Sequence, residues 1–376
     1  MERHQFYFLE PSKVGSQHIT LIEGYLTALK SSASIVENFE LNLCASKTTL
    51  AALPDTLISG FQCRVVFVMN PEKRRLVIKT LVELFVVLRH MIKLRTGDIL
   101  FISCVLPTTL WLLEISNQLL RRAGVHVVLH GEVEGLFEKS PQSIQRIGYW
   151  AAKWLNSRNV GSLISLVVID DFIRDKLIQE YPNIFSISNI SVVHIPVSPV
   201  SFNVEEDQRI FTICFIGYRT GFKGFESFLQ MTSAHPKIKF LAIGDGKVEN
   251  VRDGTVKQIS NKTDYLKEIS RCSAAVFPYT YGYSCSLSAA ALDALSTGVH
   301  IYALDRPCFH NLALYFGSNF VTVRASIEDI NAELSNLTMS HIQEDRASRL
   351  VQLSNSKYGL ASVQRSFEKL AFNIIL

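Results

Sequence analysis

Short segments that are apolar on both faces recur along this chain, and stretches with helical periodicity separate them. Runs of this kind predict strands buried on both sides, as in a parallel sheet covered by helices. The predicted strands of the first half are 5–11, 41–46, 62–70, 98–106, 125–132, 165–171 and 190–196. Those of the second half are 211–217, 238–246, 255–260, 273–279, 298–304 and 319–323. The alternation predicts an α/β fold of two doubly wound, Rossmann-like domains.

The alternation stops once, at 195–210, which holds two prolines, two serines and an acidic cluster without periodicity. Such composition indicates a linker. We therefore expect an N-terminal domain over 1–197 and a C-terminal domain over 208–340. We expect a last helical part, 341–376, to cross back to the N-terminal domain. Because ligands bind at the carboxyl ends of parallel strands, two such domains in series predict a central cleft.

Composition excludes several classes of protein. Hydrophobic residues at 48% and charged residues at 19% of 376 residues indicate a folded chain, not a disordered one. A net charge of +4 is too small to favour nucleic-acid binding. Seven scattered cysteines without a C-x-x-C pair favour a reducing compartment and no thiolate metal site. No signal peptide or membrane span is predicted, so we expect a cytoplasmic protein.

The segment 211–224 carries the strongest functional signal. A β-branched apolar run ends at Gly217, and a short loop with Arg219, Lys223 and Gly224 precedes an amphipathic stretch. Glycines let a backbone approach a ligand closely, and a helix N-terminus attracts anions. Two cations at that point suit a diphosphate. The alternative is an ordinary strand–helix turn whose cations are solvated.

Three further motifs follow in a fixed order: a Gly244–Gly246 turn after a strand, the segment 270–279, and a helix running from Asp293 to Gly298. Together with 211–224, they resemble the retaining, GT-B-fold glycosyltransferases of family 4. The resemblance covers about 211–303 and is weaker in the first half, where 127–132 and 191–196 fall at counterparts of family segments.

The resemblance implies transfer of a hexose from a nucleotide-diphosphate sugar to a growing surface glycan of the O-antigen kind. Two basic stretches, described below, suggest that this acceptor is lipid-linked. We expect no cofactor and no metal, because cations of the loop can take a metal's place and the sequence has no Asp-x-Asp that suggests one. The resemblance places Gly217 and Gly244 at the donor, and His130 against the transferred sugar. Arg219 and Lys223 would neutralise the diphosphate and stabilise the leaving group. For His130, a buried histidine bonded to the backbone is the alternative.

Other candidate residues are weaker signals. Ser284, Ser286 and Ser288 precede an alanine-rich helix and could offer hydroxyl and N–H donors to a phosphate, or simply cap the helix. Asp293 would accept hydrogen bonds from ribose, or else form an ion pair with a neighbour. Gly15 could place backbone N–H groups at the diphosphate, although turn chemistry explains it nearly as well.

The chain departs from the family pattern at four positions. The family has two glutamates eight positions apart, and here Cys285 replaces the first and Asp293 the second. Tyr218 separates the glycine from its arginine, and His300 replaces a proline. Two alternatives therefore stay open. One is a nucleotide-sugar 2-epimerase, and the other is a non-catalytic partner protein that binds nucleotide-sugar.

Two stretches suggest an anionic membrane surface as a partner. Residues 73–95 interleave seven basic residues with aliphatic ones, and 146–158 combine two tryptophans and a tyrosine with basic residues. Such helices are typical of interfacial contact. The prediction is peripheral association with the inner face of the plasma membrane. A core helix with solvated basic ends is the alternative for the first stretch.

Overall fold

The computed structural model describes residues 3–14, 18–69, 76–120, 124–130, 133–137, 149–150, 153, 156–157, 164–185, 190–200, 202, 211–244, 256–257, 259, 262–280, 282–336 and 346–372. The chain divides into two compact units. The first unit comprises 1–196, 285–287 and 360–376, and the second comprises 197–284 and 288–359.

The first unit contains a seven-stranded sheet in the order β3-β2-β1-β4-β5-β6-β7, with every described pairing parallel. Its strands are β1 (His4–Leu9), β2 (Phe39–Ala45), β3 (Gln62–Val65), β4 (Ile99–Ile102), β5 (Val125–Leu129), β6 (Ser165–Val168) and β7 (Ile190–Val192). The order reverses between β1 and β4, where Phe6 lies opposite Ile99. In open α/β sheets, ligands bind at this switch point.

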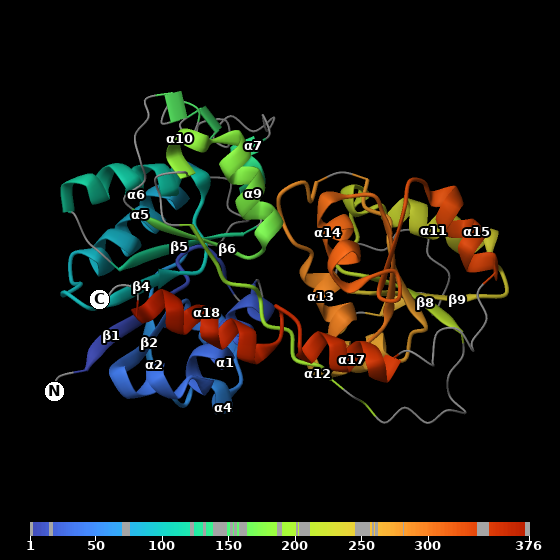
Figure 1. Cartoon of the computed structure of the whole chain (residues 1–376), viewed down its shortest axis with the longest axis horizontal. Coiled ribbons are helices and arrows are strands. Elements are labelled where there is room, and N and C mark those ends of the chain that lie inside the picture. Colours follow the sequence, from blue (N-terminus) through green and yellow to red (C-terminus); the bar gives the residue numbers. More distant parts are fainter. Residues whose placement is uncertain are drawn as a thin grey trace. The chain divides into compact units, whose positions relative to one another are not determined.

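Helices surround this sheet (Figure 1). They are α1 (Ile19–Ser31), α2 (Ala33–Asn38), α3 (Lys47–Ala52), α4 (Asp55–Ile58), α5 (Leu76–Met91), α6 (Pro107–Leu120), α7 (Glu134–Phe137), α9 (Asp171–Glu180), α10 (Pro182–Phe185) and α18 (Leu360–Phe372). Serine caps begin two of the short helices. The hydroxyls of Ser32 and Ser46 accept from the backbone N–H groups of Ile35 and Thr49.

The C-terminal helix α18 belongs to the first unit and packs against α1 (Figure 1). The Phe367 ring lies 5.2 Å from the ring centroids of both Tyr25 and Phe101. The Ser32 hydroxyl donates to the Glu368 carboxylate at 2.6 Å. Aromatic packing and this polar contact attach the end of the chain to its first helices.

The end of the chain differs from the single helical stretch that the pattern over 342–374 indicates. The structure has two helices there, α17 (Arg346–Ser354) and α18. At Gly359, a Cβ would lie 2.1 Å from the carbonyl oxygen of Ser354. The backbone turns back on itself too tightly for a side chain at this point, so the helix is interrupted.

The second unit contains a six-stranded parallel sheet in the order β10-β9-β8-β11-β12-β13. Its strands are β8 (Thr212–Ile216), β9 (Lys239–Ile243), β10 (Val256–Lys257), β11 (Ala274–Phe277), β12 (His300–Leu304) and β13 (Val321–Arg324). Its helices are η3 (Gly221–Lys223), α11 (Phe225–Ala234), α12 (Lys262–Ser270), α13 (Ala289–Ser296), α14 (Pro307–Phe316), α15 (Ile327–Asn336) and α17. The switch point lies between β8 and β11.

Buried aromatic and aliphatic residues of both sheet and helices form the core of this unit. Phe215 and Phe228 are fully buried with ring centroids 5.4 Å apart, and Ile330 of α15 joins them. The predicted doubly wound α/β fold is confirmed in both units. Sequence patterning missed α14, although Pro307 at its first turn and Gly317 just past its end are typical helix boundaries.

Candidate functional site

Two glycines meet at the switch point of the second sheet. Gly217 follows β8 with φ 117°, and its N–H donates to the carbonyl of Ile243 at 2.9 Å. Gly244 follows β9 with φ 135°, and a Cβ there would lie 2.5 Å from the Gly217 carbonyl oxygen. Both positions need glycine, because of their φ angles and because the two backbones touch. The loop after β8 therefore starts from a closely packed base.

The same loop is attached at its other end to β11. Gly224 adopts φ 69°, and a Cβ there would lie only 1.8 Å from the carbonyl oxygen of Pro278. The N–H of Thr280 donates to the carbonyl of Phe222 at 3.1 Å. Both contacts hold the short 3-10 turn η3 against the end of β11. The position of Lys223, the last residue of η3, follows from these backbone contacts.

Lys223 directs its ammonium group to the base of the loop. Its Nζ lies 3.1 Å from the point where a Cβ on Gly217 would be, and the Ala290 Cβ in the first turn of α13 lies 3.7 Å from that point. The ring centroids of Tyr279 and Tyr283 are 5.5 and 6.0 Å from Nζ. Burial lowers the pKa of Lys223 to about 8. The structure thus brings together Gly217, Lys223 and the start of α13.

Arg219 lies on the same loop and is 7% exposed. Its guanidinium keeps its charge at any ordinary pH and offers donors in a planar array. The loop therefore carries two largely buried cations within five residues. An anion bound here would offset the cost of removing these charges from water.

The three serines before α13 have different roles in the structure. Ser288 is the N-cap, and its hydroxyl accepts from the N–H of Ala291 and lies 3.2 Å from the Tyr279 hydroxyl. Ser286 groups with the first unit, where it donates to the Glu134 carboxylate at 3.1 Å. The N–H of Cys285 donates to the same oxygen at 2.7 Å. Ser284 belongs to the second unit, and a phosphate role for the three residues stays a prediction.

Asp293 lies in α13 and is 7% exposed. Its Oδ1 is 2.6 Å from the Nζ of Lys262, and this ammonium lies 5.1 Å from the Tyr265 ring centroid. Burial, and next the Asp293 charge, raise the pKa of Tyr265. The ion pair with a neighbour, which the sequence left open, is present. A ribose contact for Asp293 stays a prediction.

In the first unit, the structure places His130 directly after β5, half-buried. Its ring packs edge-on against that of His18, with centroids 4.9 Å apart. His18 precedes α1 in a left-handed conformation with φ 62°, and its Nδ1 lies 3.7 Å from Glu10 Oε2. The Gly15 prediction, with Ser16 beside it, lies outside the described residues.

Glu10 is a candidate that the sequence interpretation missed. It follows β1, is fully buried, and accepts from the N–H groups of Ser12 and Lys13, both at 2.9 Å. The Ser103 hydroxyl, just after β4, donates to its other oxygen at 2.8 Å. Glu10 therefore occupies the switch point of the first sheet. An acid immediately after an apolar strand, followed by Pro11, was the available signal.

One group of described residues has metal-ligand chemistry: Asp170, Asp171 and His194 of the first unit, whose ligand atoms lie within 4.8 Å of one another. The structure assigns other contacts to them. Asp170 caps α9 by accepting from the N–H of Phe172, and Asp171 pairs with His194 and Arg174. The expectation of a metal-free enzyme stays a prediction.

No sequence family model and no curated protein matches this chain. Solved structures do match it. A glycosyltransferase from Rickettsia africae ESF-5 has a TM-score of 0.63 at 12% identity, over 100% of this chain and 99% of that one. Sucrose-phosphate synthase (tll1590) from Thermosynechococcus elongatus has a TM-score of 0.66 at 12% identity, over 99% of both chains. The fold is GT-B.

The GT-B match extends to Anabaena Alr3699/HepE in complex with UDP-glucose. Its TM-score is 0.64 at 12% identity, over 99% of this chain and 100% of that one. Against the GtfA/B complex, the match covers 79% of this chain and 60% of that chain, with a TM-score of 0.52. At these identities the likeness establishes the fold, and function has to be argued from the site.

Proposed function

We propose that this protein is a retaining glycosyltransferase that takes a hexose from a nucleotide-diphosphate sugar. The observation that carries the proposal is the position of Lys223. Its ammonium lies beside Gly217 and the first turn of α13, at the switch point of the second sheet. A diphosphate there meets a cation, glycine backbone and the N-terminus of a helix.

The proposed chemistry is departure of the nucleoside diphosphate. Cleavage of the bond to the sugar leaves negative charge on a phosphate oxygen, and a fixed cation stabilises that charge in the transition state. Lys223 and Arg219 supply the charge in this proposal, so no metal is needed. The second unit is then the donor-binding domain and the first unit the acceptor-binding domain. His130 is the proposed contact to the transferred sugar.

We propose a lipid-linked glycan as the acceptor, with peripheral attachment to an anionic membrane. Solved structures with UDP and UDP-glucose exist for HepE, which has the same fold. Among the helices that the structure describes, none combines the length and the apolarity needed to cross a bilayer. Of the second predicted contact stretch, Tyr149, Trp150 and Lys153 are described, and Lys153 pairs with Glu180 at 2.6 Å. Trp154 lies outside the described residues.

A direct test begins with thermal shifts for UDP, GDP and UDP-glucose, comparing the unmodified protein with Lys223→Gln. A ligand at one hundred times its Kd stabilises the native state by about 2.7 kcal/mol. We expect one nucleotide class to raise the Tm of the unmodified protein only. Donor consumption with a lipid-linked acceptor, and the anomeric configuration of the product by NMR, then test transfer and retention. No shift with any nucleotide contradicts the proposal.

A second candidate function is nucleotide-sugar binding without turnover. The observation in its favour is Cys285, a buried thiol at the position where the resembling family has a glutamate. Burial raises the pKa of this thiol, so it stays neutral and cannot supply a carboxylate's charge. Binding of UDP-glucose without consumption, with every acceptor tried, would favour this candidate.

A further inference from the structure

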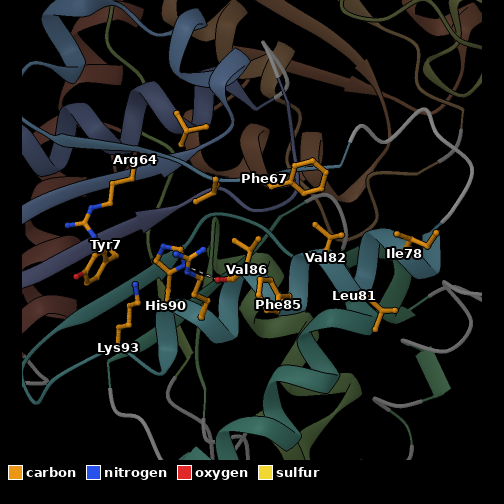
Figure 2. Close-up of a pocket in the computed structure, with 13 residues that line it drawn as sticks. Tyr7, Arg64, Phe67, Ile78, Leu81, Val82, Phe85, Val86, His90 and Lys93 are labelled. Atoms are coloured by element: carbon orange, nitrogen blue, oxygen red, sulfur yellow. Dashed lines mark hydrogen bonds between the residues drawn. The ribbon is translucent and has the colours of Figure 1, made fainter.

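The first unit has a pocket of about 450 Å³ that contains none of the proposed donor-site residues. Its lining comes from Tyr7 of β1, from residues 64–67 at the end of β3, and from one side of α5 with the turn after it (Figure 2). The strand β3 is the edge strand of the sheet. A volume in this range is that of a small-molecule site.

One end of the pocket is apolar and open to solvent. Figure 2 shows Phe67 above Phe85 and Leu81 at this end. The exposed fractions of these side chains are 72% for Phe67, 68% for Phe85 and 56% for Leu81. Val65 and Ile78 beside them are exposed as well. A contiguous group of exposed large apolar side chains marks an interaction site.

The other end is cationic. Arg64, Arg89 and Lys93 line it together with His90. The Arg64 guanidinium carbon lies 5.7 Å from the ring centroid of Tyr7. Burial lowers the pKa of His90, its contact with the Val86 carbonyl raises it, and the charges of Lys93, Arg89 and Arg64 lower it further.

Among the described residues, the lining itself does not balance this positive charge, and the nearest carboxylates are those of Asp98 and Glu40, whose charges act on Tyr7. No carboxylate lines the pocket, and within the described ranges none forms an ion pair with Arg64, Arg89 or Lys93. Three clustered cations beside an open apolar surface are complementary to a molecule with a phosphate at one end and hydrocarbon at the other.

We propose that this pocket binds one anionic phospholipid of a bilayer. The lipid phosphate lies at Arg64, Arg89 and Lys93, and the first part of its hydrocarbon chains lies against Phe67, Leu81 and Phe85. The proposal rests on the membrane attachment proposed above. It replaces general attraction to a basic surface by a defined site for one lipid molecule. It also assigns a role to Arg64, Val65 and Phe67, which the sequence does not mark as an interfacial helix.

The apolar half decides against a site for free phosphate, because a free anion does not need exposed phenylalanine side chains. The cationic end argues against a purely hydrophobic docking surface, because an apolar partner protein docked there would bury three charges without partners. A phospholipid uses both halves at once. Its chains continue from the open end of the pocket into the bilayer.

The first experiment is vesicle co-sedimentation of the full chain with phosphatidylglycerol or phosphatidylcholine vesicles. Arg89→Gln with Lys93→Gln removes two charges from the pocket, and Lys237→Gln with Lys239→Gln removes two exposed charges from the second unit. We expect roughly 25-fold weaker phosphatidylglycerol binding for the first pair, since each interfacial cation contributes about fivefold. We expect less than twofold for the second pair. Equal losses for both pairs would overturn the proposal in favour of a diffuse charge effect.

The second experiment uses dihexanoyl phosphatidylglycerol below its micellar concentration, with dihexanoyl phosphatidylcholine and glycerol phosphate as comparisons. We expect calorimetric binding of the first at one molecule per chain, at least tenfold tighter than either comparison. Phe67→Ser with Phe85→Ser should abolish it without lowering the Tm, because both side chains are exposed. Equal binding of glycerol phosphate, unchanged binding by the serine variant, or a dimer in lipid-free buffer that this variant dissociates would each overturn the proposal.

The donor site serves as an independent readout. Both pocket variants should keep the nucleotide-induced thermal shift of the unmodified protein. If no nucleotide binds while the lipid results hold, the proposed transferase activity fails and the lipid site stands. If nucleotide binds and sugar is transferred while lipid binding fails, only this proposal fails.

Discussion

The six strands of the second sheet follow the same order as the first six of the other sheet, but the two switch points carry opposite charge. In the second unit, Lys223 lies beside Gly217 on a loop that also holds Arg219. In the first unit, the same topological position holds the buried carboxylate of Glu10, bonded to Ser103. A doubly wound sheet provides a site at each switch point, and the residues decide which ligand each can take. Among the described residues, the second position offers cations to a diphosphate and the first offers a carboxylate.

The largest effect we expect tests the cationic loop. Lys223→Ala should lower the turnover of donor about a hundredfold, or roughly 3 kcal/mol in the barrier, since one donor to developing charge is lost. The Tm should stay the same or rise, because a buried charge is removed. Steady-state kinetics and thermal melts measure both. Lys237→Ala, an exposed lysine of the same unit, is the control. Parallel loss of Tm and activity would make Lys223 a structural residue.

The second prediction concerns the acidic position of the first unit. Glu10→Gln should lower the free energy of unfolding by about 2 kcal/mol, because a buried carboxylate with three donors becomes a neutral amide. Nucleotide binding should change little, since the cations proposed to bind the diphosphate, Arg219 and Lys223, lie in the second unit. Urea denaturation and the nucleotide thermal shift measure the two quantities. A loss of nucleotide affinity in the folded variant would break the contrast between the two sites.

The third prediction is a pH dependence of nucleotide affinity. The pKa of Lys223 is held at about 8, and binding of a diphosphate favours the protonated amine. The Kd for UDP should therefore rise about tenfold between pH 7 and pH 9, as the free protein loses this proton. Calorimetry at several pH values measures it. Lys223→Gln should show a flat profile over this range, and an equally steep profile in that variant would exclude Lys223 as the cause.

The lowered pKa of Lys223 also predicts how the free energy of unfolding depends on pH. Between pH 8 and Lys223's ordinary value of 10.5, the unfolded chain binds more protons than the folded one. The contribution of Lys223 to the free energy of unfolding should rise with pH in this window and stay constant below it. Denaturation curves of the nucleotide-free protein and of Lys223→Gln at pH 7 and pH 9 give the difference.

The smallest effect we expect comes from metal removal. Turnover should survive a strong chelator, because the proposed charge stabilisation comes from Lys223 and Arg219. Asp171→Asn, which alters the group of Asp170, Asp171 and His194, is the companion test and should leave turnover within about twofold, a change of less than 0.5 kcal/mol. Loss of activity with chelator and recovery with magnesium would show that the cationic loop does not act alone.

Much of the fold could be predicted from the sequence. Strands buried on both faces read as continuous apolar runs, so all described strands of both sheets coincide with predicted segments. The sequence also indicated positions of close backbone approach, where a side chain would not fit: Gly217, Gly224 and Gly244. The division of the last stretch into α17 and α18 was not predicted, because the short turn at Gly359 leaves a weak periodic signal. The helix α14 was overlooked although its boundary residues were present in the sequence.

The sequence by itself determined which residue types surround each strand end, including the cationic loop at 217–224. Only the tertiary structure decided how those residues are used. The pairing of Asp293 with Lys262 and the bonding of buried Glu10 to Ser103 arise between separate elements of the chain. The same holds for the pocket where Arg64 and Phe67 lie beside α5. Such contacts depend on how side chains pack across elements, and local patterns carry no information on that.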